Sequence, residues 1–396
     1  MNFVYVSPHF PANMWLYCQA LTRNGVDVLG IGDAALEDLP QELRDNLRDY
    51  YRVTSLEDQG EMVRALGYFT WRWGRLDWLE SNNEYWLEKD AWLRQQFHIT
   101  TGPQPEQMPL WKHKSLMKSG YEAAGIKTAP WQLADTFEKA SAFAKEAGYP
   151  LVVKPDNGVG AAGTYRINDE AHLRHFFDHL PMQPYIIEKC VFGEICSYDA
   201  LIDSRGEPLY ETGNITRGNI MDFVNERQDC VFYIVPEAAE DLKALGRKAV
   251  KAFGVKSRFI HFEFFRLSQD QEGLGKRGDL VGLEVNMRPS GGYSSDMMNY
   301  AGSVDMYRMW ADMILRDRVW LDEDRQTYWC VFLGRRDSKR YRHQHHDLLR
   351  EWRHRIVLEA RLPRALSDTM GDQVYLVRCR NLEEMDAFLS YGTEGA

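Results

Sequence analysis

Two carboxylates, Glu263 and Glu284, lie in strand-like runs on either side of a polar loop. The runs are FIHFEFFRL (259–267) and LVGLEVNMRPSGG (280–292), and the loop is SQDQEGLGKRGD. Because side chains alternate between the two faces of a strand, Glu263 shares a face with His261, and Glu284 shares a face with Asn286. Each carboxylate therefore has a second polar group beside it.

A hairpin between these runs would bring the two carboxylates together. With Leu267 opposite Leu280, Glu263 lies opposite Glu284. Opposed like charges destabilise a sheet unless a cation lies between them, and clustered oxygen ligands suit Mg²⁺ with a phosphate-bearing substrate. A loop of this length determines the register weakly, and a one-residue slip would separate the pair. A metal-free ion pair between Arg288 and one carboxylate is the alternative.

A glycine-rich segment, GVGAAG (158–163), fits the dinucleotide-binding pattern. That pattern requires the loop to open a helix, but TYRIN follows with strand character, and the next helix start is Asn168 or Asp169. The segment instead fits a loop between two strands whose backbone N–H groups approach phosphates, with Lys154 as a nearby positive charge. The alternative is a surface hairpin beside a solvated lysine.

The elements that would position these groups differ along the chain. Strands and helices alternate over 2–97, with helical stretches expected around 39–50 and 56–73, which predicts a parallel sheet covered on both faces. Residues 98–113 are expected to be a linker. The chain beyond is β-rich with intervening helices, as in a mixed α+β domain, and the fold class is therefore α/β and α+β multidomain.

Ligands of such parallel sheets bind beyond the carboxyl ends of the strands. Ser7, His9, Glu80 and Asn83 follow two predicted strands and are candidates for substrate contact. Turn and helix-cap roles are the alternative for each of them.

Composition restricts the compartment and the partners. A length of 396 residues predicts two or three domains, and a net charge of -10 disfavours nucleic acid or an anionic membrane as a partner. The 6 cysteines are scattered, which indicates free thiols in a reducing compartment. With no leader and no apolar span, we expect a cytoplasmic protein. The basic run 335–346 is interpreted as a solvated face or an anion-handling loop.

The order of four features in the sequence resembles that of the ATP-grasp superfamily: Lys154, the glycine loop, IIEK (186–189) and LEVN (283–286). This superfamily includes carboxylate-amine ligases and the carbamoyl phosphate synthase large subunit. The resemblance covers about residues 1–315. It implies an ATP-grasp fold behind a Rossmann-like domain. The implied domains are 1–112 (Rossmann-like), 113–190 (small ATP-grasp subdomain), 191–318 (large subdomain with the metal site) and 319–396 (C-terminal α/β extension).

The resemblance also implies site residues. The nucleotide would contact Lys114, Lys154, Gly158, Gly160, Gly163, Glu188, Lys189, Val191 and Glu194. Glu263, Glu284 and Asn286 resemble the ligands of two Mg²⁺ ions, for which Mn²⁺ can substitute, and Arg288 resembles the arginine beside the reacting carboxylate. A solvated lysine at a helix start remains the alternative for Lys114, and His261 is interpreted as a hydrogen-bonded core histidine rather than a ligand.

The implied activity is an ATP-dependent ligase of class EC 6.3. It would activate a substrate carboxylate as an acyl phosphate, join it to an amine and release ADP and phosphate. The alternatives are phosphorylation of a small carboxylate, as in carbamoyl phosphate synthase, and a regulatory protein that binds ATP without turnover. The expected partners are a small-molecule carboxylate and an amine, without nucleic acid or membrane, and a homo-oligomer is compatible with the resemblance.

Overall fold

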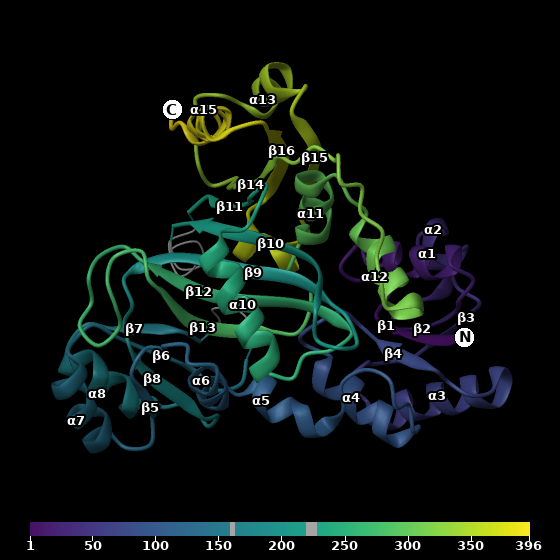
Figure 1. Cartoon of the computed structure of the whole chain (residues 1–396), viewed down its shortest axis with the longest axis horizontal. Helices are drawn as coiled ribbons and strands as arrows, with labels where there is room; N and C mark the ends of the chain where they lie inside the picture. Colours follow the sequence, from purple (N-terminus) through teal and green to yellow (C-terminus); the bar gives the residue numbers. More distant parts are fainter. Residues whose placement is uncertain (159–162, 219–227) are drawn as a thin grey trace.

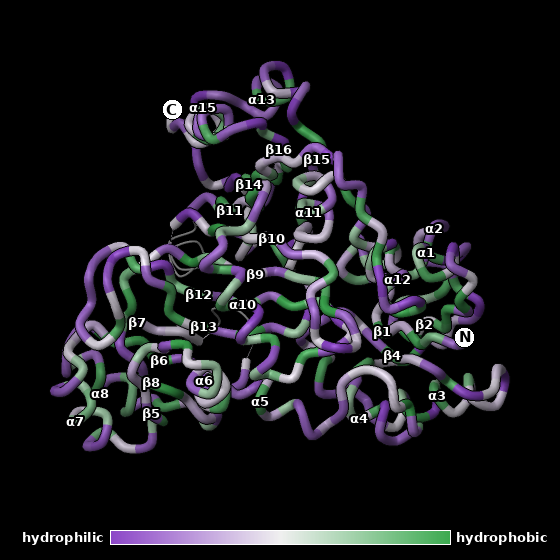
Figure 2. The backbone as a smooth tube through the Cα atoms, viewed as in Figure 1, coloured by the Kyte–Doolittle hydropathy of each residue, from purple (hydrophilic) through white to green (hydrophobic). Residues whose placement is uncertain are grey.

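The computed structural model describes residues 1–158, 163–218 and 228–396, which form three β-sheets with helices packed around them (Figure 1). Hydrophobic residues concentrate along the strands and the inner helices, whereas many outer loops are hydrophilic (Figure 2). The three sheets follow one another along the chain, and the site described below lies where the second and third meet.

The N-terminal sheet is parallel, with strand order β3-β2-β1-β4. Its strands are β1 (Asn2–Val6), β2 (Asp27–Gly32), β3 (Asp49–Arg52) and β4 (Trp78–Glu80). Its helices are α1 (Trp15–Arg23), α2 (Gln41–Arg44), α3 (Gln59–Trp73) and α4 (Leu87–Gln96), with a 3₁₀ turn η1 (Leu36–Asp38). The helix expected around 39–50 is wrong, because only 41–44 is α-helical and Asp49 to Arg52 pair with β2 as an edge strand.

The segment expected to be a linker contains a 3₁₀ turn, η2 (Pro105–Gln107), and a short helix, α5 (Met108–Lys112). Trp111 on α5 is fully buried, and its indole N–H donates to the carbonyl of Phe253 at 2.8 Å. The linker expectation is therefore wrong for 105–112, which packs against the third sheet.

The second sheet is small and antiparallel, with order β5-β8-β6-β7. It comprises β5 (Trp131–Leu133), β6 (Leu151–Pro155), β7 (Tyr165–Ile167) and β8 (Tyr185–Lys189), with helices α6 (Lys114–Ala123), α7 (Phe137–Ala147) and α8 (Glu170–Asp178). Alternate residues of β6, Leu151 and Val153, pack with Ala140 of α7 and Leu173 of α8 in one core. A strand does follow the glycine loop, as predicted, and Asp169 caps α8.

The third sheet is an eight-stranded antiparallel sheet, with order β13-β12-β9-β10-β11-β14-β16-β15. Its strands are β9 (Gly193–Ile202), β10 (Pro208–Arg217), β11 (Cys230–Ile234), β12 (Arg258–Leu267), β13 (Leu280–Asn286), β14 (Trp329–Arg335), β15 (Ile356–Arg361) and β16 (Gln373–Cys379). The helices of this part are α10 (Glu240–Ala252), α11 (Ser294–Gly302), α12 (Met306–Arg316), α13 (His345–Trp352), α14 (Arg364–Met370) and α15 (Leu382–Thr393).

Residues 319–396 contribute β14, β15 and β16 to the same sheet as the carboxylate hairpin. The division into four domains stays a prediction, but no sheet edge separates 319–396 from the preceding region. The basic run 335–346 is not a fully solvated face: Arg335 and Arg336 are buried, and Arg335 stacks on Tyr341 and donates to the carbonyl of His343 at 2.7 Å.

The register of β12 and β13 brings the two carboxylates together. Glu263 pairs with Glu284 and His261 pairs with Asn286, which confirms the predicted register at this end of the hairpin. Near the loop the prediction is wrong, because Leu280 pairs with Arg266 rather than with Leu267. A β-bulge between Glu263 and Phe264 absorbs the one-residue difference.

Candidate active site between the second and third sheets

A cavity of about 530 Å³ lies between the small sheet and the carboxylate hairpin. All of the predicted site residues except the loop glycines line it: Lys114, Lys154, Glu188, Lys189, Val191, Glu194, Glu263, Glu284, Asn286 and Arg288. They come from α6, β6, β8, β9, β12 and β13 and the turns that follow. The fold therefore gathers residues that are up to 174 positions apart in sequence (288 minus 114).

The two carboxylates of the hairpin have separate cationic neighbours. Glu284 Oε1 lies 3.1 Å from Lys114 Nζ, and Glu263 Oε1 lies 3.1 Å from His261 Nε2. Lys114 is buried, so its alternative interpretation as a solvated lysine is wrong. Like charges on adjacent strands are thus tolerated because each has a positive partner.

His261 is hydrogen-bonded on both ring nitrogens, as expected for a core histidine. Its Nδ1 lies 2.7 Å from Asp199 Oδ1. Burial by itself would lower the pKa of His261, but the adjacent Asp199 and Glu263 carboxylates outweigh burial and raise that pKa to about 10. The two carboxylates therefore favour the protonated ring, and the contact with Nε2 orients Glu263.

Arg288 contributes to the charge balance of the site without a direct ion pair in the described part of the chain: burial would raise the pKa of Glu263, but His261 together with Arg288 outweighs burial and lowers that pKa. Its Nη1 donates to the carbonyl of Pro289 at 2.7 Å, and it forms no ion pair with Glu263 or Glu284. The expected alternative, a metal-free ion pair between Arg288 and a carboxylate, is wrong, and the guanidinium lines the cavity.

Glu188 lies between two lysines. Its Oε1 is 2.6 Å from Lys154 Nζ and its Oε2 is 2.8 Å from Lys118 Nζ, and all three side chains are buried. Burial would raise the pKa of Glu188, but the charges of Lys118 and Lys154 overcome burial and lower it to about 2. Sequence reasoning missed Lys118, although its position four residues after Lys114 on α6 places both amines on one helix face.

Replacing Glu188 with glutamine should destabilise the fold by about 3 kcal/mol at pH 7, because two buried ammonium groups would lose their counter-charge. A carboxylate with a depressed folded-state pKa stabilises the fold above its unfolded pKa and loses that contribution as pH falls towards the folded value. The difference between wild type and variant should therefore shrink between pH 4.5 and about pH 2. Urea unfolding across this range measures it.

The matched control is Glu237→Gln, which removes an exposed carboxylate paired with Lys243. It should change the free energy of unfolding by less than about 0.5 kcal/mol. A Glu188→Gln variant as stable as this control would contradict the buried-charge interpretation.

The glycine loop is described only at its ends. Gly158 accepts a hydrogen bond from Lys114 Nζ at 3.1 Å. Gly163 has φ +71, and a Cβ there would lie 2.8 Å from the Tyr185 hydroxyl, so this position requires glycine. Gly160 lies outside the described residues.

Asp156, which the resemblance places at the start of the phosphate loop, joins the end of β6 to the start of α6. Its carboxylate accepts from the Ser115 backbone N–H at 2.7 Å and from the Ser115 hydroxyl at 3.0 Å. Lys114 is thereby held at the start of α6, facing the cavity.

The connection between β8 and β9 forms another wall of the cavity. Lys189, Val191 and Glu194 lie along it, with Phe192 between them. Burial raises the pKa of Glu194, and the positive charges of Arg217 and Arg266 reduce this rise without cancelling it. The wall thus offers an apolar surface with a carboxylate at one end.

A second cavity of about 800 Å³ shares Arg288 with the first. Its walls include Ser7, His9 and Asn83 at the carboxyl ends of β1 and β4, as expected for candidate substrate contacts. Glu80 is not among the lining residues, because it is buried and pairs with Arg94 at 3.1 Å. The expectation that Glu80 contacts substrate therefore lacks support from the structure.

The described residues contain no group of three or more His, Cys, Asp or Glu side chains arranged to hold a metal ion. Glu263, Glu284 and the amide of Asn286 nevertheless line the same cavity, and oxygen donors suit Mg²⁺ when phosphate oxygens complete its coordination. The donor set fits a nucleotide-bound Mg²⁺ rather than a metal held by protein alone.

The chain is similar to several known proteins. Residues 113–183 match the family model "Carbamoyl-phosphate synthase L chain, ATP binding domain". The carbamoyl phosphate synthase large chain of Kocuria rhizophila is 32% identical over 170 residues, covering 40% of this chain and 15% of that protein. The L-arginine-specific L-amino acid ligase of Bacillus subtilis is 25% identical over 250 residues, covering 59% of this chain and 56% of that protein.

Among solved structures, the L-amino acid ligase of Bacillus licheniformis superposes with a TM-score of 0.74 at 16% identity, covering 98% of this chain and 95% of that one. This likeness over nearly the whole chain confirms the predicted fold class. The chain spans less than two thirds of the length of both curated relatives. In the described parts of the chain, every helix is too short or too polar to cross a bilayer.

Proposed function

We propose that the chain is an ATP-grasp enzyme, a Mg²⁺- and ATP-dependent ligase that joins a carboxylate to an amine. One observation carries the proposal: Arg288 lines both the cavity that holds the lysines and carboxylates and the larger cavity beside it. A substrate carboxylate held by Arg288 would thus lie at the junction of a nucleotide site and a substrate site.

The first cavity suits ATP. Lys114, Lys154 and the amides of the glycine loop would neutralise the phosphates, while Lys189 and the backbone of Val191 would contact the adenine and Glu194 the ribose. Glu188 would act through Lys118 and Lys154, whose ammonium groups it holds in place. Glu263, Glu284 and Asn286 would hold two Mg²⁺ ions beside the phosphates.

Bound Mg²⁺ would supply charge stabilisation of the phosphates during transfer. Arg288 would pair with the substrate carboxylate and direct one of its oxygens at the γ-phosphorus of ATP. A new O–P bond forms, the bond to the β–γ bridging oxygen breaks, and ADP leaves. An amine then attacks the acyl carbon, phosphate departs with the bonding electrons, and the amine loses a proton to give an amide.

The larger cavity favours an organic carboxylate over a small acid such as bicarbonate. Its volume of about 800 Å³ lies in the range of sites for whole metabolites. Phe10, Trp86 and Met370 contribute apolar surface, and the pair formed by His9 and Asp33 at 3.1 Å contributes polar groups. We propose an amino acid or a related acid with an apolar portion as the carboxylate substrate.

The ligation is tested by incubating the purified chain with ATP, Mg²⁺ and pairs drawn from amino acids, dipeptides and small organic acids. We expect ADP release only with certain pairs, together with a product whose mass is the sum of the two substrates minus water. ADP release with bicarbonate alone would favour the carbamoyl-phosphate-synthase-like alternative. Nucleotide binding without turnover for any pair would favour the regulatory alternative and contradict the proposal.

A further inference from the structure

Met287 separates two residues of the proposed reaction centre, Asn286 at the end of β13 and Arg288. The β12–β13 ladder ends at the pair His261 and Asn286, so the Met287 backbone lies just beyond the strand pairing of this hairpin. The Met287 side chain is fully buried in the core. Buried peptide groups require hydrogen-bond partners, which here must come from outside the ladder.

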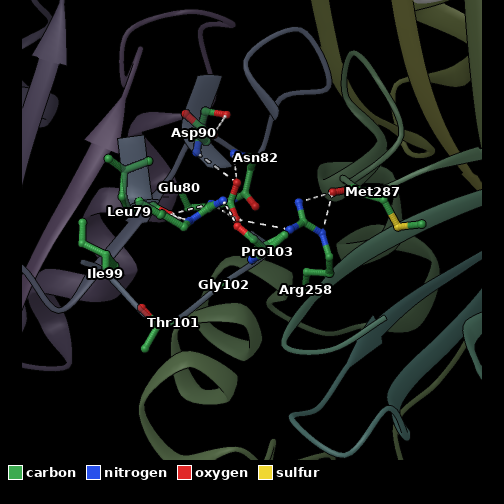
Figure 3. A network of polar contacts seen from close by, with 12 residues as sticks. Leu79, Glu80, Asn82, Asp90, Ile99, Thr101, Gly102, Pro103, Arg258 and Met287 are labelled. Carbon is green, nitrogen blue, oxygen red and sulfur yellow. Dashed lines mark hydrogen bonds and ion pairs between the residues drawn. The ribbon is translucent and has the colours of Figure 1, made fainter. Parts of the chain in front are cut away.

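Two charged side chains supply these partners from opposite sides. The Met287 N–H donates to Glu84 Oε2 at 3.1 Å. Arg258 Nε donates to the Met287 carbonyl at 2.8 Å, and Arg258 Nη2 donates to the same oxygen, as Figure 3 shows. Hydrogen bonds to ionised groups are about twice as strong as neutral ones, so this peptide is held more firmly than a ladder pair would hold it.

The two charged groups are themselves held in place. Glu84 Oε1 pairs with Lys112 Nζ at 3.2 Å. Arg258 Nη1 lies 3.6 Å from Glu80 Oε2, and the Arg258 guanidinium lies 5.5 Å from the centre of the Trp111 ring. Both are almost completely buried, which leaves them little freedom to move.

The network continues into the N-terminal sheet. Arg94 donates to Glu80 Oε2 at 3.1 Å, to the Leu79 carbonyl at 2.7 Å and to the Pro103 carbonyl at 2.8 Å. The carboxyl end of β4 is thus connected through buried charges to the end of β13.

We propose that Arg258 and Glu84 are positioning residues: by holding the Met287 peptide, they set the directions of Asn286 and Arg288 in the reaction centre. This inference rests on the proposed function. Rotation of the Met287 peptide would displace the side chains on both sides, and a displacement of about 1 Å can cost on the order of 100-fold in rate. It also gives Glu80 a role through Arg258 instead of contact with substrate.

The isosteric variant Glu84→Gln tests the N–H side of the peptide. In one orientation of the amide that replaces the Glu84 carboxylate, its oxygen accepts from the Met287 N–H and its NH₂ group faces the ammonium group of Lys112, so that two donors oppose each other. In the other orientation the oxygen faces Lys112 and the NH₂ group faces the Met287 N–H. One of the two contacts is therefore lost in either case. We expect kcat to fall about tenfold with the KM for ATP unchanged, because no residue of the nucleotide cavity is altered. Hydrogen exchange of the Met287 amide should become about tenfold faster.

The variant Arg258→Lys tests the carbonyl side, since lysine cannot make both hydrogen bonds and also reach Glu80. Its matched control is Arg335→Lys, which alters another buried arginine that donates to a backbone carbonyl, that of His343. We expect kcat to fall about tenfold in Arg258→Lys and to stay at the wild-type value in the control.

Each outcome decides the inference. A wild-type Met287 amide that exchanges freely, or folded Glu84→Gln and Arg258→Lys variants with the wild-type kcat, would overturn it. Equal loss of kcat in Arg335→Lys would indicate general loosening and would also overturn it. A wild-type chain that ligates no pair of substrates contradicts the proposed function instead, and the exchange rate of the Met287 amide still decides whether the two side chains hold this peptide.

Discussion

Replacing Glu284 with alanine should reduce ATP-dependent ligation by at least about 1,000-fold. Glu284 is one of the residues that we propose to hold Mg²⁺, and Lys114 Nζ lies 3.1 Å from its Oε1. Its loss would remove a metal ligand and leave Lys114 without its carboxylate partner. The rate of ADP release at saturating substrate measures the effect, and thermal unfolding establishes that the variant is folded.

The control for this variant is Glu211→Ala, which removes a strand carboxylate of similar exposure from the same sheet. The Glu211 side chain is 15% exposed and pairs with Arg247, whereas that of Glu284 is 13% exposed. This control should retain wild-type turnover. Unchanged turnover in a folded Glu284→Ala variant would remove Glu284 from the mechanism.

Replacing Lys154 with methionine should weaken the binding of ATP by about 100-fold, the upper range for a lost hydrogen bond to a charged group. The methionine keeps much of the apolar length of the lysine, and Glu188 keeps Lys118 as a partner, so the carboxylate is not left unpaired. The nucleotide would lose one positive charge beside its phosphates. Isothermal titration with ATP and Mg²⁺ measures the dissociation constant.

Lys243→Met is the corresponding control, because the Lys243 side chain is also largely buried and paired with carboxylates. Its partners are Glu237, which precedes α10, and Glu240, which lies on α10. It should bind ATP as the wild type does. Wild-type affinity in a folded Lys154→Met variant would contradict the proposed contact between Lys154 and the phosphates.

Local patterns were sufficient for much of the fold. Strand alternation together with a hairpin register predicts that Glu263 and Glu284 lie opposite each other, and the structure confirms this pair although a bulge shifts the register nearer the loop. The strand character after the glycine loop argues against a dinucleotide-binding helix, and the structure confirms the strand. The same reasoning failed around residue 49, where a short edge strand is stabilised by pairing with β2 rather than by its own sequence.

Long-range contacts could not be predicted in the same way. No local pattern indicates that Lys118 shares Glu188 with Lys154, or that Glu84 and Arg258 meet at the Met287 peptide. These contacts depend on how three sheets pack, and buried ion pairs form only when packing removes water from both partners at once.

The sequence by itself determined which side chains share a face of each strand, because that periodicity belongs to the backbone. It thereby specified a pair of carboxylates on one hairpin, and a lysine and a glycine loop on another. Only the tertiary structure decided which charges neutralise one another and that Arg288 borders both cavities. The reason is that electrostatic partners are selected by proximity and burial, which arise when distant segments pack together.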